Sequence, residues 1–381
     1  MIKEFIKTKK TTLLCCGPMS KNCIDASIEI FQQYNLPLIL VASRNQIDSE
    51  EMGGGYVENF TTKQFVDYVR GKSKSNVFLE RDHGGPYQNS REQHLDLNIG
   101  DAMASAKKSL EQDIQFGFDL LHLDPSIPIQ NESLSLDKIL DRLFELYGHT
   151  FEFAKQNGKK IHFELGTEEQ SGYGQDLDKF EHFLNETKKF CEKNRITKPT
   201  FVVAQTGTKV METKNVGIFS DDLESIDSNA AEHLKKALAI CKRYDVLLKE
   251  HNTDYLSSEA LALRPILGIN ACNVAPEFGV QETRGLLYLL RISGFKKEFD
   301  LFVKTAVSSN KWKKWMLSDS TATEIDKAVI CGHYVFSNVI ISEMKRRVYG
   351  EMKKKGVDLD EFLKTSIKAN IAKFLSLLNW V

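Results

Sequence analysis

Two features of the sequence predict an α/β fold, a (β/α)8 TIM barrel followed by a C-terminal α-helical extension. Short apolar runs alternate with amphipathic helical stretches, and eight such runs occur before the chain leaves residue 276. This alternation is typical of a parallel sheet in which a helix follows each strand. The competing open, doubly wound sheet usually has a glycine-rich turn after its first strand, but residues 15–22 contain a single glycine.

Each predicted strand is a short run of apolar or β-branched residues that ends in Gly, Pro, Asp, Asn or Ser, as buried strands commonly do. In chain order, these runs occupy residues 12–17, 36–43, 76–83, 119–126, 160–167, 200–207, 245–252 and 266–276. The intervals between them have helical periodicity. Several of these helical stretches end in glycine or a basic residue, which helix C-termini favour.

About a hundred residues remain after the eighth predicted strand, and their pattern is helical. A barrel needs one helix at this point, so we expect residues 1–292 to form the barrel domain and residues 293–381 to form a helical extension. No segment rich in Pro, Gly and Ser separates the two parts. We therefore expect the extension to pack on the barrel.

Composition excludes several classes of protein. The 51 basic and 52 acidic residues give a net charge of −1, which is unlike the basic domains that bind nucleic acid. No apolar run approaches the roughly 20 residues that cross a bilayer, and the charged N-terminal stretch does not resemble a secretory signal. The seven cysteines are scattered without a CxxC pair, which indicates reduced thiols. These observations predict a cytoplasmic protein without membrane or nucleic-acid partners.

Polar residues collect where the predicted strands end, at the face where barrel enzymes carry their active sites. His83, Glu168 and His251 follow the third, fifth and seventh strands, so they are predicted to converge on one divalent metal ion. Imidazole and carboxylate ligands suit zinc, with manganese, iron or nickel as alternatives. Asp82 precedes a predicted ligand and is the predicted general acid and base.

An alternative interpretation of these residues remains open, because any barrel mouth exposes polar loop residues that form only hydrogen bonds. His122 lies inside a predicted strand, which favours a core histidine or a substrate contact over a metal ligand. His333 lies in the extension, where helix packing is the simpler role. It reaches the site only if the extension folds over the barrel mouth.

At this point the chain resembles a known family through an ordered set of motifs. They are VASRNQI, GGGYVENFTTKQFVDYV, LERDHGGP, GFDLLHLDPS, ELGTEEQSG and EHNTDY. The family contains the so-called non-catalytic subunit of class II tagatose-bisphosphate aldolase, and some members carry the label tagatose-6-phosphate kinase. The similarity runs nearly end to end. The broader relatives are class II metal-dependent ketose-bisphosphate aldolases, which are (β/α)8 barrels.

The resemblance implies roles for individual residues. Asp82 and His83 match the aldolases' acid/base and metal-ligand pair, and His251 matches their last histidine ligand. Glu168 stands where those enzymes have a histidine, which lowers the charge of the centre by one unit. Asn273 matches the asparagine that contacts the enediolate, and its NVAP segment is closer to the catalytic aldolases than to the non-catalytic subunits.

The resemblance also suggests which residues contact the sugar. The predicted substrate-binding residues are Asn45, Asp124, Gln205, Asn252 and Thr253. The predicted function is metal-dependent retro-aldol cleavage and formation of a carbon–carbon bond in a ketose or ketose (bis)phosphate. One alternative is a ketose C4-epimerase that uses the same site. Another is a non-catalytic stabilising subunit. The predicted partners are a small sugar or sugar phosphate and either further copies of this chain or a catalytic aldolase subunit.

Overall fold

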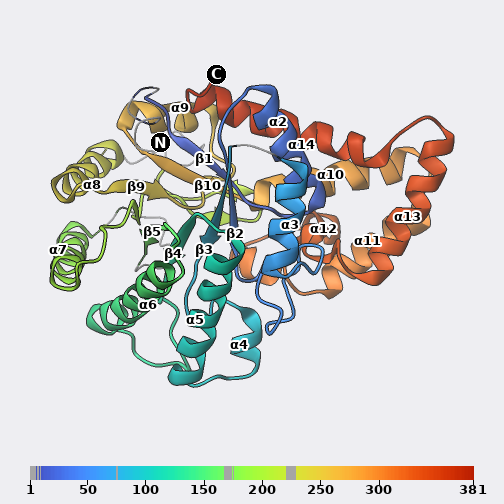
Figure 1. The fold of residues 1–381 in the computed structure, drawn as a ribbon. Helices are drawn as coiled ribbons and strands as arrows, with labels where there is room; N and C mark the ends of the chain where they lie inside the picture. The colour runs from blue at the N-terminus through green and yellow to red at the C-terminus, as the bar shows by residue number, and fades with distance from the viewer. Residues whose placement is uncertain are drawn as a thin grey trace.

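The computed structural model describes residues 6, 8, 10–73, 76–166, 174, 176–219 and 229–381. Within these residues, eight parallel strands close into a barrel in the order β1-β10-β9-β6-β5-β4-β3-β2 (Figure 1). Helices surround the barrel, and further helices extend from one side. The predicted (β/α)8 fold with its C-terminal helices is therefore confirmed.

Each barrel strand falls inside one of the predicted runs. The strands are β1 (Leu13–Cys16), β2 (Leu38–Ser43), β3 (Val77–Asp82), β4 (Leu120–Leu123), β5 (His162–Leu165), β6 (Phe201–Val203), β9 (Leu247–Glu250) and β10 (Ala271–Val274). A small antiparallel pair lies in the loop after β6, formed by β7 (Val210–Met211) and β8 (Lys214–Asn215). Because the barrel strands are parallel, their C-terminal ends open at a single mouth.

Polar side chains cap the first turns of several helices that follow the strands. Ser20, Thr61, Asn98 and Ser135 each accept a backbone N–H from the first turn of the following helix. The helices around the barrel are α2 (Lys21–Gln33), α3 (Thr62–Lys72), α4 (Ser90–His94), α5 (Ile99–Phe116), α6 (Leu136–Gln156), α7 (Leu177–Asn194), α8 (Ala230–Tyr244), α9 (Ser258–Leu267) and α10 (Pro276–Ile292).

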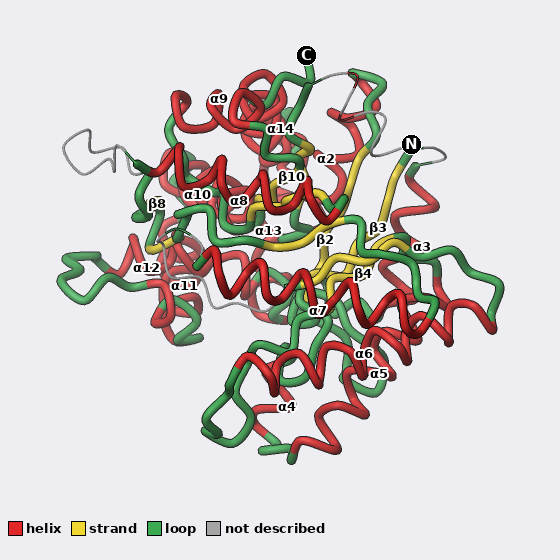
Figure 2. The backbone as a smooth tube through the Cα atoms, turned by 90° about the vertical axis from the view of Figure 1, so that its left-hand side faces the viewer, coloured by secondary structure: helices red, strands yellow, loops and turns green. Residues whose placement is uncertain are grey.

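The helices of the extension contact the helices of the barrel. The elements of the extension are α11 (Lys296–Ser308), η1 (Lys313–Trp315), α12 (Glu324–Cys331), η2 (Gly332–Val335), α13 (Val339–Lys354) and α14 (Leu359–Leu377). Most of them share a second hydrophobic core with the end of α10. The last helix, α14, runs back beside α2 and α10, as Figures 1 and 2 both show. The proposed boundary at residue 292 stays a prediction.

The return of α14 ties the end of the chain to the barrel wall. Its apolar face, including Ile371 and Phe374, belongs to the barrel's own core. Beyond the helix, the indole N–H of Trp380 donates to the carbonyl of Thr12 at 2.7 Å, and its ring packs edge-on against Phe31. The final residues therefore complete the barrel's helical layer beside β1.

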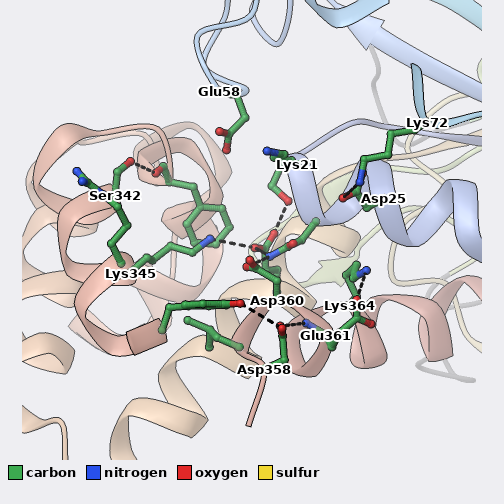
Figure 3. Close-up of a pocket in the computed structure, with 17 residues that line it drawn as sticks. Lys21, Asp25, Glu58, Lys72, Ser342, Lys345, Asp358, Asp360, Glu361 and Lys364 are labelled. Carbon is green, nitrogen blue, oxygen red and sulfur yellow. Dashed lines mark hydrogen bonds and ion pairs between the residues drawn. The ribbon is translucent and has the colours of Figure 1, made fainter. Parts of the chain in front are cut away.

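A cavity of about 550 Å³ lies where α2 meets α13 and α14 (Figure 3). Charged side chains of both signs line it, and several of them pair with each other. Lys345 lies 3.6 Å from the fully buried Glu282, and Lys72 lies 3.2 Å from Asp25. This cavity marks a polar seam between the barrel and the extension.

In the described part of the chain, no helix is both long and apolar enough to cross a membrane. All seven cysteines are buried and free. The predicted cytoplasmic location stays a prediction.

Candidate metal centre at the barrel mouth

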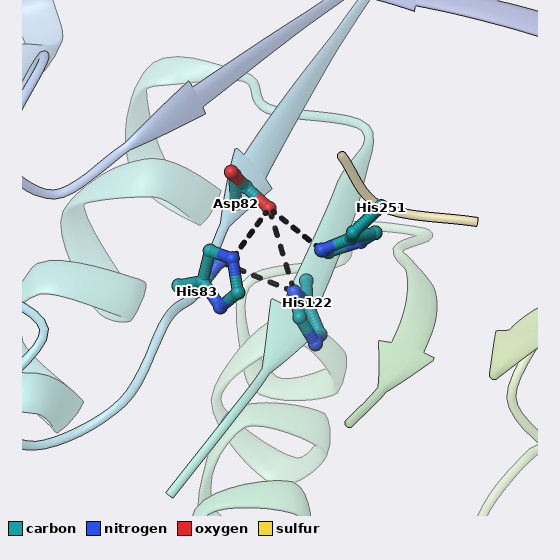
Figure 4. Close-up of side chains that lie close together, drawn as sticks. All are labelled: Asp82, His83, His122 and His251. Carbon is teal, nitrogen blue, oxygen red and sulfur yellow. Dashed lines mark hydrogen bonds and ion pairs between the residues drawn. The ribbon is translucent and has the colours of Figure 1, made fainter. Parts of the chain in front are cut away.

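Four side chains from three strand ends meet at the mouth of the barrel. Asp82 ends β3 and His83 follows it, His122 lies in β4, and His251 follows β9. Each offers one potential ligand atom, and these atoms lie within 4.8 Å of one another. Figure 4 shows the carboxylate of Asp82 with the three imidazole rings around it. This cluster is the candidate site.

Asp82 is the electrostatic centre of the cluster. Its Oδ1 lies 3.6 Å from His83 Nε2, 3.6 Å from His122 Nδ1 and 3.9 Å from His251 Nδ1. Burial raises the pKa of Asp82, but the imidazoles, His83 foremost, outweigh it and hold that pKa well below its usual range. Asp82 is therefore ionised at neutral pH and able to accept a proton.

His83 is held in a strained position by a second carboxylate. Its backbone φ of 47° lies in the left-handed region, which is uncommon for a residue other than glycine. Its Nδ1 lies 2.5 Å from Asp124 Oδ2, which leaves Nε2 facing the cluster. Burial lowers the pKa of His83, but Asp82 and Asp124 raise it to about 9. The carboxylates around His83 therefore favour positive charge at this point.

His251 is oriented from the barrel interior. Its Nε2 donates to the buried Glu164 Oε1 at 2.9 Å, so Nδ1 faces Asp82. Burial lowers the pKa of His251, which favours the neutral imidazole that metal ions require. The other oxygen of Glu164 accepts from Lys249 at 2.9 Å, and Lys249 also pairs with Glu80. A buried ion network thus supports this histidine.

His122 fits into the cluster because glycines surround it. A Cβ on Gly166 would lie 2.4 Å from His122 Nε2, and a Cβ on Gly84 would lie 2.7 Å from the carbonyl oxygen of His122. Larger residues at these positions would force the backbone or the ring to move. His122 Nδ1 accepts the backbone N–H of His83 at 3.2 Å, while its Nε2 is buried without a partner among the described residues.

Two buried arginines fix the loops that carry these residues. The guanidinium of Arg44 contacts Glu92 at 2.7 Å and donates to the carbonyl of Gly85 at 2.9 Å, which joins the β2 and β3 loops. Arg81 forms a two-pronged pair with Asp113 at 2.7 and 2.8 Å. Planar, two-pronged pairing restricts both partners, so the mouth is rigid on the β3 side.

The structure brings the two predicted catalytic residues together. The side-chain amide of Asn273 donates to Asp82 Oδ1 at 3.4 Å, and its buried Oδ1 has no partner among the described residues. Of the predicted metal ligands, His83 and His251 lie in the cluster. Glu168 lies outside the described residues, so the ligand set of His83, Glu168 and His251 stays a prediction.

The predicted substrate contacts occupy varied positions, and their roles remain predictions. Asp124 is bonded to His83, and the side chain of Asn45 bridges the loop at residues 88–90. Gln205 is nearly buried after β6. Asn252 follows His251 with a φ of 56°. Thr253 is fully buried, and its hydroxyl donates to Glu250 at 3.0 Å, so it is already used in a structural contact.

Sequence reasoning did not select His122 or Glu164 for the site. A signal was available in the spacing, because alternate strand residues share a face. His122 stands two residues before Asp124, and the register pairs it with Glu164 on β5. Since all but one position of β4 and β5 is buried, the sequence alone did not show which face points to the barrel axis.

His333 reaches the mouth region because the extension does fold over it. The hydroxyl of Ser337 donates to the carbonyl of Tyr56 at 2.8 Å, and the backbone N–H of Glu212 donates to the carbonyl of Trp315 at 2.6 Å. His333 packs beside Tyr56 and is buried, with both ring nitrogens lacking a partner in the described residues.

The donor set of the cluster fits a divalent transition metal. Imidazole nitrogens and a carboxylate oxygen suit zinc and its neighbours in the first transition row. Metal-binding histidines usually donate their second N–H to a carboxylate, and the contacts of His83 with Asp124 and of His251 with Glu164 follow that pattern. The fold and site together define a TIM-barrel protein with a cluster of histidines and a carboxylate at the barrel mouth.

The chain belongs to the D-tagatose-1,6-bisphosphate aldolase subunit GatZ/KbaZ-like family, whose model matches residues 1–278. This match confirms the family resemblance that the motifs indicated. No curated protein sequence matches the chain.

Solved structures share the fold at low sequence identity. A probable tagatose 6 phosphate kinase from Sinorhizobium meliloti is 17% identical with a TM-score of 0.72, and the match covers 96% of this chain and 100% of that one. Fructuronate-tagaturonate epimerase UxaE from Cohnella laeviribosi is 11% identical with a TM-score of 0.60, covering 97% and 81%. Fructose-bisphosphate aldolase from Campylobacter jejuni is 12% identical with a TM-score of 0.52, covering 100% and 93%. These likenesses establish an aldolase-like fold.

Proposed function

We propose that this chain is a metal-dependent enzyme that cleaves and forms a carbon–carbon bond in a ketose or ketose phosphate by retro-aldol chemistry. The observation that carries the proposal is the position of Asp82, whose ionised carboxylate lies among three imidazoles and beside the amide of Asn273. A base adjacent to a set of metal-binding donors is what this reaction requires.

His83 and His251 would hold the ion, with His122 as the third donor from the described residues and Glu168 as the third ligand predicted from the sequence. A divalent ion bound there polarises a carbonyl group and stabilises the negative charge that develops on its oxygen. Zinc is the ion that we expect. Asp124 and Glu164 orient the two imidazoles through the contacts described above.

The remaining chemistry belongs to the chain itself. In cleavage, Asp82 takes the proton from the C4 hydroxyl of the sugar, and in condensation it returns that proton. The amide of Asn273, which lies beside Asp82, would donate a hydrogen bond to the oxygen that gains charge. The lowered pKa of Asp82 keeps its carboxylate ionised at neutral pH.

The same residues support a second outcome. If the aldehyde fragment stays bound, turns over and adds again, the net reaction is epimerisation at C4. The structural neighbour that is named a fructuronate-tagaturonate epimerase shares this barrel and spans 97% of the chain, so its substrates belong in the test.

Purified protein loaded with zinc should be incubated with tagatose 1,6-bisphosphate, fructose 1,6-bisphosphate and tagaturonate, and the products followed by NMR. Release of triose phosphate fragments supports the aldolase. A new epimer without fragments supports the epimerase. Asp82→Asn should abolish either reaction, while Asp141→Asn on the exposed face of α6 should retain it.

A third outcome would overturn the proposal. If the protein holds no stoichiometric metal and transforms none of these sugars, it is a non-catalytic subunit. In that case, mixing this chain with a catalytic aldolase subunit would raise the stability of the catalytic subunit. The Asp82→Asn variant would stabilise that subunit equally well.

A further inference from the structure

A large cavity lies between the loops of the barrel mouth and the extension. Its volume is about 810 Å³. Loops after β2 and β3, including Gly53–Gly55 and Gln88–Arg91, form one wall, and residues 310–314 with Tyr334 form the other. We call it the lysine cavity after Lys311, Lys313 and Lys314.

The lysine cavity adjoins the candidate metal centre. Ser43, at its edge, stands directly opposite Asp82 in the β2–β3 register. Gln88, in its wall, donates to Asp124 Oδ2 at 2.8 Å, and Asp124 holds His83. Two hydrogen-bonded side chains, Gln88 and Asp124, therefore link the wall of the cavity to His83.

The charge of the cavity is unbalanced. Arg91, Lys311, Lys313 and Lys314 line it, and its described lining residues include no carboxylate. None of these four cations forms an ion pair with another described residue, whereas many surface lysines do, as Lys63 does with Asp67 at 2.5 Å. Positive charges gathered in a cavity raise the local concentration of anions.

The cavity beside α14 provides an internal comparison (Figure 3). Cations line that cavity too, but Lys345 faces Glu282, Lys72 faces Asp25 and Lys364 pairs with Glu361. Carboxylates therefore line that cavity together with its cations. Of the two cavities, only the lysine cavity is lined by cations without any carboxylate among its described lining residues.

Two of the four cations, Lys314 and Arg91, lie close against neighbouring groups. The ammonium group of Lys314 lies 5.5 Å from the ring centre of Tyr334 and 4.6 Å from that of Trp315. Arg91 lies close to Gly53 in the loop after β2. A Cβ on Gly53, whose φ is 76°, would lie 3.1 Å from Arg91 Nη1. The contacts of Ser337 and Trp315 with the mouth loops fix the extension at this point.

We propose that the lysine cavity is a binding site for a phosphate dianion, built jointly by the barrel and the extension. Three ammonium groups and a guanidinium match the charge of a phosphate ester better than that of a single carboxylate. Resting on the proposed function, the inference assigns this phosphate to the substrate, whose carbonyl end reaches the Asp82 cluster. The extension then supplies substrate contacts that the barrel lacks.

The test uses the full chain with Asp82→Asn, so that binding is measured without turnover. Inorganic phosphate, fructose 1,6-bisphosphate and unphosphorylated fructose are titrated by calorimetry. We expect the bisphosphate to bind, phosphate to compete with it and fructose to bind at least tenfold more weakly. Phosphate and bisphosphate bound together would place the anion at a separate effector site and overturn the assignment to substrate.

Two matched triple variants locate the binding. Replacing Lys311, Lys313 and Lys314 with Gln should weaken the bisphosphate at least about tenfold. The control replaces the exposed residues Lys353, Lys354 and Lys355 at the end of α13, and it should change affinity less than twofold. Equal effects of the two variants, or no effect of the first, would refute the site.

Failure of this inference is distinguishable from failure of the proposed function. Phosphate binding that depends on the three lysines stands even if no reaction is found. Conversely, an active enzyme whose KM for a sugar phosphate is unchanged in the first triple variant retains its function and loses this site.

Discussion

The mouth and the interior of the barrel both bury charged side chains, but they balance the charge differently. Glu80 and Asp82 lie two residues apart on β3, and Lys249 and His251 are spaced in the same way at β9. In the interior layer, Lys249 pairs with both Glu80 and Glu164. In the mouth layer, Asp82 faces three imidazoles and its side chain keeps 19% exposure.

The difference separates structure from function. The interior network is fully buried, and its ammonium group faces two carboxylates, although Glu80 Oε2 has no partner among the described residues. The mouth cluster is open, with ligand atoms that face one another and an unpartnered oxygen on Asn273. Buried charges that pair with each other support the barrel around them. Ligand atoms that face one another at the mouth are instead complementary to a cation and a substrate. The two layers should therefore respond oppositely to substitution.

The largest expected effect is on catalysis. Asp82→Asn should lower kcat/KM by about 10²- to 10⁴-fold, because it removes the proposed base. Its cost in unfolding free energy should be smaller than that of a change in the interior layer. Steady-state kinetics and urea unfolding measure the two quantities. An active Asp82→Asn enzyme would show that the mouth cluster does not supply the base.

The largest stability effect should come from the interior. Lys249→Met leaves two buried carboxylates without their cation and should destabilise the fold by about 3–5 kcal/mol. Urea unfolding followed by circular dichroism measures it. Adding Glu80→Gln should recover part of the loss, because one carboxylate is then neutral. A Lys249→Met protein as stable as the parent would contradict the distinction between the two layers.

A smaller effect is expected where a carboxylate orients a histidine. Asp124→Asn should weaken zinc binding by about 10- to 100-fold, since it removes the acceptor for His83 Nδ1. Competition with a chromophoric chelator measures the affinity. The matched control is Asp119→Asn. Asp119 lies at the other end of β4 and pairs with the exposed Arg70. Equal affinities for the two variants would remove the orienting role.

The smallest expected effect is a pH dependence of the unfolding free energy, which we attribute to His333, a buried histidine that no carboxylate of the described residues contacts. Burial, with the nearby charge of Lys314, lowers the pKa of His333 to about 3. Between that value and its ordinary pKa of about 6.5, the unfolded chain binds the proton and the folded chain does not, so stability falls as the pH falls. From pH 7.5 to 5.5 this contribution is about 1.4 kcal/mol.

His333→Phe should remove that contribution and flatten the pH dependence of unfolding by the same amount. Urea unfolding at the two pH values gives the difference directly, and the comparison does not depend on whether the variant is more or less stable overall. Parallel pH profiles for the variant and the parent would show that His333 is protonated equally in both states.

The strand pattern and the strand ends were predictable from the sequence for a physical reason. A parallel barrel strand is short, apolar and bounded by turn residues, and these are local properties. Asp82 ends its strand, and His83 and His251 directly follow theirs, so their place at the mouth follows from chain direction alone. Motifs around the same residues carried the family resemblance.

The sequence did not determine which buried side chains share a layer. His122 and Glu164 meet because β4 and β5 pair in one register, and that register depends on closure of the whole barrel. The lysine cavity likewise joins residues more than two hundred positions apart, when the extension packs over the mouth. Local periodicity and turn chemistry thus determined the barrel and its polar rim. Only the tertiary structure decided which charges balance and which remain free for a ligand, because that depends on distances between segments remote in the chain.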